Sequence, residues 1–180
     1  MRLFIAIETS KEVCDYLFSL QDKFKTDEID YGKFSFTKTF HLTLKFLGEV
    51  EDDKVDTIKE KLSGINLERF SLNLAKIGVF PDKHNPRVLW VGIKESRKVC
   101  DLQKIVDDKL STMYEKDFSF SPHLTLARIK FLNNKCEFVK KFNSINIRKI
   151  EFGVDSLFLI KSILTKEGPS YEKLAEYRLS

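Results

Sequence analysis

Apolar positions along the chain follow strand-like spacing in some segments and helix-like spacing in others. Apolar runs and period-two alternation predict an extended segment at residues 150–164 with a bend at Gly153, and strands at residues 2–7, 34–36, 40–50, 70–80, 87–93, 123–129 and 171–179. Spacings of three and four residues predict helices that begin at Ser10, at Asp52 and Asp53, at Ser96 and near Glu137. Because helices and strands alternate through most of the chain, we expect an α+β or α/β protein of two layers.

One tetrapeptide, His-Leu-Thr-Leu, occurs twice in the chain, beginning at His41 and again at His123. The two copies are separated by close to half the chain, and they contain two of its three histidines. A chance match around so rare a residue is not expected. The repeat therefore predicts two halves related by a pseudo-twofold axis.

Each copy of the tetrapeptide is expected to present its histidine and its threonine on one face of a strand. Alternate residues of a strand point to the same side, so His41 lies beside Thr43 and His123 beside Thr125. The leucines point the other way, into a core. A twofold axis would bring both histidine–threonine pairs to one central cleft. A repeated polar face is costly to bury unless it lines a site, so the pattern favours a catalytic centre over structural histidines.

Two histidines on opposite sides of a small anion suit the hydrolysis of a cyclic phosphodiester. One must take a proton from the attacking water, and the other must protonate the departing oxygen on the far side of phosphorus. Histidine can do both near neutrality because its unperturbed pKa is about 6.5. Threonine hydroxyls can hold the non-bridging phosphate oxygens, whose charge grows in the transition state. These residues predict no requirement for a metal or another cofactor.

Beyond the two motifs, the sequence offers one competing use of the histidines and three further cations for the same site. Zinc is a weaker use of the histidines, since no cysteine or carboxylate stands near them at ligand spacing. His84 lies in a turn rich in proline and asparagine and is expected at the surface. Three cations are candidates for binding phosphate. Lys45 is in phase with His41 along its strand, whereas Arg128 reaches the site only if its strand bulges or ends after residue 126. Arg87 is the third candidate.

The composition is that of an ordinary globular protein. The 180 residues are expected to form a single two-lobed domain over residues 1–180, with enough apolar material for a core. A net charge of +4 permits a polyanionic ligand without requiring one. Three widely spaced cysteines, Cys14, Cys100 and Cys136, argue against a disulfide framework and favour a reducing, cytoplasmic setting. No apolar stretch reaches membrane length, so no membrane association is expected.

The two motif segments resemble the signatures of a known superfamily, the two-histidine phosphoesterases. The segment that begins at His41 reads His-Leu-Thr-Leu-Lys-Phe-Leu-Gly, and the one that begins at Ser121 reads Ser-Pro-His-Leu-Thr-Leu-Ala-Arg. The opening Met-Arg-Leu-Phe-Ile-Ala-Ile, the Arg-Val-Leu-Trp at residues 87–90 and the closing residues 162–179 are also similar to the family pattern. Within the superfamily, the chain is most similar to the RNA 2′,3′-cyclic phosphodiesterases, historically called 2′-5′ RNA ligases, over nearly its whole length.

The resemblance implies both a fold and an activity. The fold would be bilobal α+β, with two pseudo-twofold-related βα lobes whose antiparallel sheets form a central cleft carrying one His-x-Thr-x motif from each lobe. The activity would be hydrolysis of an RNA 2′,3′-cyclic phosphate end to a 2′-phosphate, in RNA processing. By this resemblance His41 would donate the proton to O3′ and His123 would accept one from water, a division that the residues alone do not provide. The substrate-binding residues would be Thr43, Thr125 and Arg128.

Three alternatives stay open at this point. The same two histidines could form or reverse a 2′-5′ RNA linkage, or act on a small cyclic nucleotide instead of RNA. A non-catalytic module that binds RNA ends is the alternative of another class, since sixteen phenylalanines offer base-stacking surfaces. A pure binder has no need of two histidines in matched settings, so the repeat favours the enzyme. The expected partner is RNA with a 2′,3′-cyclic phosphate end, and the expected oligomeric state is a monomer.

Overall fold

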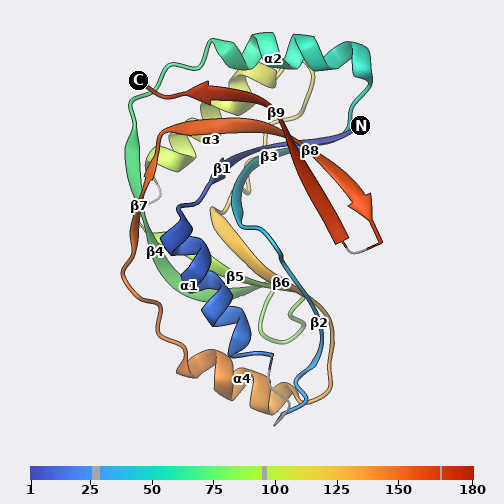
Figure 1. The fold of residues 1–180 in the computed structure, drawn as a ribbon, viewed down its shortest axis with the longest axis vertical. Helices are drawn as coiled ribbons and strands as arrows, with labels where there is room; N and C mark the ends of the chain where they lie inside the picture. Colours follow the sequence, from blue (N-terminus) through green and yellow to red (C-terminus); the bar gives the residue numbers. More distant parts are fainter. Residues whose placement is uncertain (26–28, 95–96, 167) are drawn as a thin grey trace.

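In the described part of the chain, one antiparallel sheet of nine strands organises the molecule, and four α-helices pack on it (Figure 1). The structure is a computed structural model that describes residues 1–25, 29–94, 97–166 and 168–180. Within these ranges every strand pairing is antiparallel. The α+β class is therefore confirmed, and the sheets expected for the two halves are parts of one continuous sheet.

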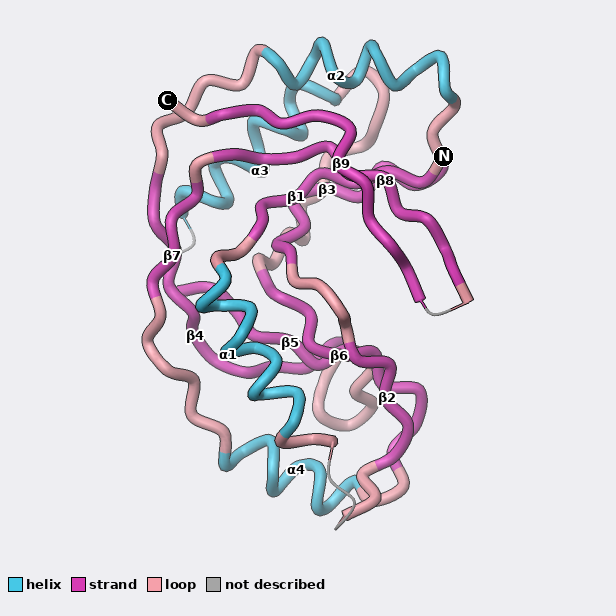
Figure 2. The backbone as a smooth tube through the Cα atoms, in the orientation of Figure 1, coloured by secondary structure: helices cyan, strands magenta, loops and turns pink. Residues whose placement is uncertain are grey.

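The helices lie toward the two ends of the molecule, α2 and α3 near one end and α1 and α4 near the other (Figure 2). The described strands are β1 (Arg2–Glu8), β2 (Gly32–Phe36), β3 (His41–Glu49), β4 (Phe70–Phe80), β5 (Val88–Lys94), β6 (His123–Leu132), β7 (Glu151–Val154), β8 (Ser156–Thr165) and β9 (Gly168–Arg178). The helices are α1 (Lys11–Asp22), α2 (Val55–Ser63), α3 (Arg97–Leu110) and α4 (Lys135–Ser144). In the part of the chain that the structure describes, no helix combines the length and the apolar character that crossing a membrane requires.

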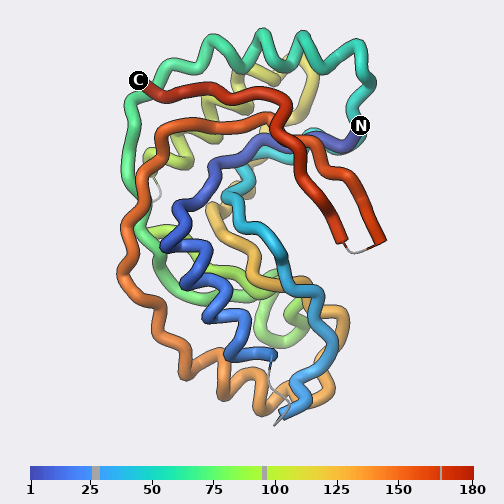
Figure 3. The backbone as a smooth tube through the Cα atoms, viewed as in Figure 1, coloured from blue at the N-terminus to red at the C-terminus, as the bar shows by residue number. Residues whose placement is uncertain are grey.

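The order of elements repeats in the two halves of the chain. β1, α1, β3 and α2 of the first half are followed by β5, α3, β6 and α4 of the second. Across the sheet the strand order is β7-β4-β5-β6-β3-β1-β8-β9, with β2 on the far half of β6, so the two tetrapeptide strands meet at its middle. β1 flanks β3 as β5 flanks β6, which the chain colours of Figure 3 make visible. This order is the one that the duplication predicted from the repeat would produce.

The core lies between the sheet and the helices. In α3 the buried apolar residues fall at spacings of three and four along one side, as Val99, Leu102, Val106 and Leu110. All four leucines of the tetrapeptides belong to the same core. α1 contacts β6 and α3 contacts β3, so the first helix of each half covers the motif strand of the other half. The face of these strands that points away from the core carries the histidines.

The helix starts predicted from the sequence have three different outcomes. Ser10 caps α1 as expected, because its hydroxyl accepts from the backbone N–H of Val13 at 3.3 Å. The prediction for Asp52 and Asp53 is wrong, since they begin a short 3₁₀ turn before α2 and make no side-chain cap. The predicted start at Ser96 lies outside the described residues.

The extended segment at residues 150–164 is two strands rather than one bent strand. β7 pairs with β4 at one side of the sheet, whereas β8 pairs with β1 on the other half. The break falls at Asp155, and Gly153 lies inside β7 opposite Ser71. The bend predicted at Gly153 is therefore wrong by two residues, because pairing partners rather than backbone flexibility decide where the strand ends.

Candidate active site

His41 and His123 are the first residues of β3 and β6, the two strands at the centre of the sheet. These strands pair antiparallel, with the second residues of the two tetrapeptides directly opposite each other. Each histidine therefore lies opposite the threonine of the other motif, and all four side chains share one face. We call this the histidine face (His41, Thr43, His123, Thr125). Diagonal neighbours in such a pair are about 7–8 Å apart, which leaves room for a phosphate-sized anion between the two rings.

His41 is packed against two aromatic rings that remove it from water. Phe4 of β1 and Tyr171 of β9 have ring centroids 4.8 and 5.1 Å from the imidazole. Burial lowers the pKa of His41 to about 4. Glu8, its partner across β1 and β3, opposes this shift, whereas the nearby His123 reinforces it. At neutral pH the imidazole of the free protein is therefore uncharged.

His123 has a matching aromatic environment on its own side. The rings of Phe80 and Trp90 lie 5.0 and 6.1 Å from the imidazole. The indole fills the space over Gly78, where a Cβ would meet it at 2.1 Å. Burial lowers the pKa of His123 too. Its Nδ1 lies 2.7 Å from the carbonyl oxygen of Ser121, and a carbonyl can only accept, so Nδ1 carries the hydrogen and Nε2 of the neutral ring keeps a free lone pair.

A matching irregularity in the two motif strands decides which residues follow the motifs on the histidine face. β3 shifts register against β1 immediately after Thr43, and β6 shifts against β5 immediately after Thr125. Such a bulge adds one residue and reverses the alternation beyond it. The next two residues of each strand are both buried, and the one after them is exposed. That exposed residue is Phe46 in β3 and Arg128 in β6, so the duplicated backbone presents a ring in one half and a cation in the other.

The bulge brings Arg128 to the histidine face, which is the condition for its predicted role. Burial raises the pKa of Tyr171, and the charge of Arg128 opposes that rise, so the two side chains are close enough to interact. Tyr171 in turn contacts His41 from the other half. Within the described ranges no acidic side chain pairs with Arg128. Its guanidinium is therefore free to bind a phosphate beside the two imidazoles.

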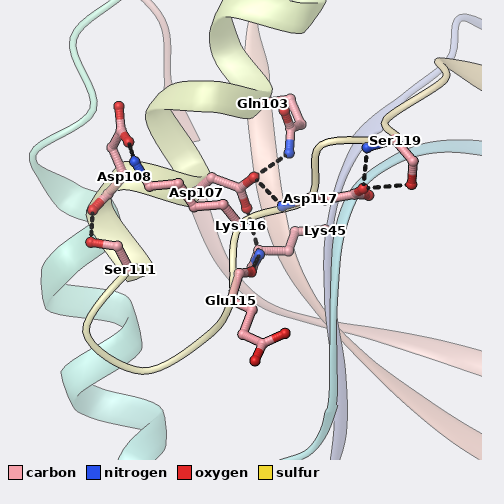
Figure 4. Close-up of polar contacts among 9 residues, drawn as sticks. All are labelled: Lys45, Gln103, Asp107, Asp108, Ser111, Glu115, Lys116, Asp117 and Ser119. Atoms are coloured by element: carbon pink, nitrogen blue, oxygen red, sulfur yellow. Dashed lines mark hydrogen bonds and ion pairs between the residues drawn. The ribbon is translucent and has the colours of Figure 1, made fainter.

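Lys45 is not at the site, and its predicted role in binding phosphate is wrong. The bulge turns it into the core, where its Nζ lies 2.5 Å from Oδ1 of Asp107 and donates to the carbonyl oxygen of Glu115 at 2.7 Å (Figure 4). The same carboxylate accepts from Nε2 of Gln103 at 2.7 Å and from the backbone N–H of Asp117 at 2.8 Å. This buried network joins β3 to α3 and to the loop that leads into β6.

Gln21 of α1 supports the bulge in β6 in a comparable way. Its side chain is buried, and Nε2 donates to the carbonyl oxygens of Leu126 and Thr37 at 2.9 and 2.8 Å. The backbone N–H of Thr37 donates to the same Leu126 carbonyl. Each bulge is thus held by a buried polar side chain from another element. The sequence carries a signal for this bulge, because the apolar positions change phase between Leu126 and Ile129.

The third histidine and the third candidate cation lie away from the histidine face. His84 is exposed in the turn between β4 and β5, as predicted. Arg87 precedes β5, and its Nη1 donates to the carbonyl oxygen of Lys130 at 3.1 Å. No disulfide joins Cys14, Cys100 or Cys136. Among the residues that the structure describes, no three histidine, cysteine, aspartate or glutamate side chains form a group that could hold a metal ion.

The burial of His41 predicts a pH dependence of stability. Its pKa falls from 6.5 in the unfolded chain to about 4 in the folded protein, so between these values only the unfolded state binds the extra proton. The free energy of unfolding should therefore decrease as the pH falls from 6.5 to 4, by about 3 kcal/mol at most. His41→Gln should flatten this dependence in urea titrations across the range, while His84→Gln serves as the control. An equal slope in His41→Gln and the parent protein would contradict the prediction.

Comparison with known sequences gives the relatives of the chain. Residues 7–90 match the family model described as LigT like phosphoesterase. A curated protein of Methanocaldococcus jannaschii named RNA 2′,3′-cyclic phosphodiesterase is 34% identical over 182 residues, covering 98% of this chain and 100% of that protein. A protein of Thermotoga maritima with the same name is 32% identical over 179 residues, covering 98% of this chain and 94% of its own length.

Solved structures share the fold over nearly the whole chain. A Thermus thermophilus protein superposes with a TM-score of 0.78 at 24% identity, covering 99% of this chain and 97% of that one. Escherichia coli LigT in complex with 3′-AMP superposes with a TM-score of 0.75 at 23% identity, covering 99% of this chain and 98% of that one. The likeness to these structures shows the fold of the chain, and the sequence relatives of higher identity show its family. The chain therefore belongs to the LigT-like phosphoesterase family and is a phosphodiesterase.

Proposed function

We propose that the protein hydrolyses RNA 2′,3′-cyclic phosphate ends to 2′-phosphates by metal-independent general acid–base catalysis. The observation that carries the proposal is the pair of histidines on one face, set diagonally across two central strands with one in the tautomer of a base. The names of the sequence relatives support the choice of an RNA cyclic phosphate as substrate. His123 is the proton acceptor and His41 the proton donor in this scheme.

The reaction is a displacement at phosphorus with water as the nucleophile. Nε2 of His123 takes a proton from the water as its oxygen forms the new bond to phosphorus. The bond from phosphorus to O3′ breaks on the opposite side, and O3′ leaves with the proton that His41 supplies. The products are a 3′-hydroxyl and a 2′-phosphate, and the two histidines exchange protonation states. General acid–base help of this kind typically contributes about 10²–10⁴ in rate.

His41 must carry a proton to act as the acid, although burial lowers its pKa to about 4 in the free protein. The cyclic phosphate is an anion, and a negative charge within about 4–6 Å of an imidazole favours the protonated form. We infer that substrate binding raises the pKa of His41 and brings the proton to it. Glu8 on the neighbouring strand assists, because its carboxylate also favours the imidazolium.

The non-bridging oxygens of the phosphate are held by the remaining polar groups of the site. The hydroxyls of Thr43 and Thr125 lie between the imidazoles on the histidine face and can donate to these oxygens. Arg128 adds a permanent positive charge in a planar, two-pronged geometry. Negative charge on the phosphate grows in the transition state, so these contacts stabilise that state more than the bound substrate.

The direct test uses a short RNA that ends in a 2′,3′-cyclic phosphate, incubated with the purified protein in excess chelator. We expect one molecule of water to be added, as seen by mass, and the new end to resist an enzyme that removes 3′-phosphates. A 3′-phosphate product would show that the other bond breaks and would reverse the assigned leaving group. Turnover that requires an added metal would refute the metal-independent scheme. Turnover of a mononucleotide cyclic phosphate alone would point to a small-nucleotide enzyme.

Phe46 is expected to stack on the base of the terminal nucleotide. Its side chain is 72% exposed on the same face as His41, beside Phe4 at a centroid distance of 6.2 Å. Base–aromatic stacking contributes about 1–3 kcal/mol per base, so Phe46→Ala should raise KM for RNA by roughly tenfold or more, with a smaller effect on kcat. Steady-state kinetics on one short cyclic-phosphate RNA measure both parameters.

A matched control is available for the Phe46 prediction. Phe118, in the loop before β6, is 95% exposed, and Phe118→Ala removes the same side chain from another surface. KM should be unaffected in this variant. Equal KM values for Phe46→Ala and the parent enzyme would rule out a stacking contact at Phe46.

A further inference from the structure

We propose that the outer face of the ribbon formed by β2 and the second half of β6 binds the single-stranded RNA that precedes the terminal nucleotide. The inference rests on the proposed function and extends it from the reacting end to the body of the substrate. In this β2–β6 ribbon, Gly32–Phe36 pairs with residues 127–132. The ribbon continues the strand that begins with His123 and extends away from the sheet centre (Figure 1). RNA that leaves the histidine face past Arg128 would follow it.

A second irregularity in β6 exposes a cation and an aromatic ring together. The register shifts between the pairs Phe34–Ile129 and Lys33–Phe131, which leaves Lys130 in a bulge. Lys130 is exposed, and the adjacent Phe131 ring is 53% exposed. Lys33 is exposed on the facing strand. One small area thus presents two ammonium groups and a free ring, the combination that single-strand binding surfaces use for phosphates and bases.

The surface beside this area is hollowed as well as basic. Lys130 and Phe131 line a hollow of about 250 Å³ together with Arg87 and Lys135. The side chains of Arg87 and Lys135 donate to backbone carbonyl oxygens, at 3.1 and 2.7 Å, rather than to carboxylates. The charge of Arg87 therefore remains available to an anionic ligand, whereas the charge of Lys135 also acts on the nearby Asp82 and lowers its pKa. A concave basic surface with one exposed ring suits a flexible strand better than a flat protein partner.

The lysines of the ribbon differ from those of the β8–β9 hairpin, on the other side of the site, in whether they pair with carboxylates. On the β8–β9 hairpin, two lysines are paired with glutamates, Lys161 with Glu172 at 3.4 Å and Lys173 with Glu8 at 2.8 Å. In the described part of the chain, no carboxylate pairs with the lysines of the ribbon. An RNA backbone needs unpaired cations for counterion release, so charge complementarity directs the strand to the ribbon.

Among the residues that the structure describes, Asp30 and Asp82 are carboxylates near the ribbon, and both are engaged by hydrogen bonds. Asp30, just before β2, accepts from the backbone N–H of Gly32 and from the side chain of Asn133. Asp82, in the turn before β5, accepts from two backbone N–H groups of its own turn, and these bonds lower its pKa. Both carboxylates are thus engaged by hydrogen bonds, and in the described residues neither forms an ion pair with Lys33 or Lys130.

The test compares two substrates with the same cyclic-phosphate end, a dinucleotide and a decanucleotide. The variant combines Lys33→Gln, Lys130→Gln and Phe131→Ser, all at exposed positions outside the catalytic site. We expect KM for the decanucleotide to rise by about tenfold or more toward the dinucleotide value, while the dinucleotide kinetics stay unchanged. The slope of log(kcat/KM) against log salt for the decanucleotide should become less negative by about 1.4, because each lost phosphate contact contributes about 0.7.

A double variant of α3, Lys98→Gln with Lys104→Gln, removes the same charge from another exposed surface and should change neither substrate. An equal rise in KM for both substrates in the ribbon variant would indicate a structural defect and overturn the inference. A rise of the same size in the α3 variant would also overturn it. Anisotropy of a labelled decanucleotide with a 2′-phosphate end separates this proposal from the catalytic one. One outcome is that the parent protein turns over no substrate while the ribbon variant binds this RNA at least tenfold more weakly than the parent does. That result would support RNA binding by the ribbon and refute the proposed function. Equal binding would overturn the ribbon.

Discussion

His41→Ala and His123→Ala are each expected to slow hydrolysis of a cyclic-phosphate RNA by about 10²–10⁴-fold, with little change in KM. Each substitution removes one of the two proton transfers while leaving the threonines and Arg128 to bind the phosphate. The pair acts as one unit, so the double variant should be scarcely slower than the slower single variant. His84→Ala, in the exposed turn, is the control and should retain full activity. Single-turnover rates in excess chelator provide the measurement.

A second substrate distinguishes the acid from the base. An aryl phosphodiester with a nitrophenolate leaving group needs no proton on the departing oxygen. On this substrate His41→Ala should recover much of its lost rate relative to the parent enzyme, whereas His123→Ala should not, since water still needs a base. Recovery in His123→Ala alone would exchange the two roles. Recovery in both variants would leave no general-base role for either histidine.

The largest effect on stability is expected from Asp107→Leu. Lys45 and Asp107 are each about 5% exposed, and the carboxylate accepts from three donors. Removing it leaves the Lys45 ammonium buried without its counterion and leaves Gln103 and one backbone N–H without an acceptor. Breaking a buried pair in this way costs roughly 3–5 kcal/mol in the free energy of unfolding. Urea denaturation of the variant and the parent protein measures the difference.

The double variant Lys45→Met with Asp107→Leu should be more stable than Asp107→Leu alone, because it removes the unpaired charge. A matched control lies at the next residue of α3. Asp108 and Lys116 also form an ion pair, but their side chains are 65% and 45% exposed (Figure 4). Asp108→Leu should cost about 0–1 kcal/mol, as water screens this pair. Similar losses for Asp108→Leu and Asp107→Leu would show that burial of the network is not what stabilises the molecule.

The buried network also explains why one apparent site residue belongs elsewhere. By simple alternation Lys45 shares a face with His41, and the sequence therefore made it a second, weaker candidate for a phosphate contact. The bulge after Thr43 reverses the alternation and gives that face to Phe46 instead. The pattern of a strand shows which face each side chain takes only while the strand pairs regularly with its neighbour. The bulge in β3 arises from its pairing with β1 and from the packing of α3, which lie elsewhere in the sequence. The sequence reasoning consequently missed Phe46, although the hypothesis for Arg128 already depended on a bulge after residue 126.

The sequence by itself determined the mixture of helices and strands, the duplicated motif and the face shared by each histidine and its threonine, whereas the antiparallel pairing that makes the class α+β came from the structure. The first three features follow from spacing within one strand or helix, where geometry depends only on neighbours along the chain. The two histidines and two threonines were therefore identified before any fold was known. The sequence also determined that the leucines of the two tetrapeptides are buried, because apolar side chains at those positions have no favourable place outside a core.

Only the tertiary structure decided how the two motifs meet. The pairing of β3 with β6 makes the histidines diagonal neighbours, and the carbonyl of Ser121 selects the tautomer of His123. The aromatic rings that lower the histidine pKa values come from β1, β4, β5 and β9, far away along the chain. Desolvation and tautomer depend on groups that folding brings together, so the pattern of any one segment cannot contain them. The difference between the two histidines is for this reason a property of the fold, while their presence as a pair is a property of the sequence.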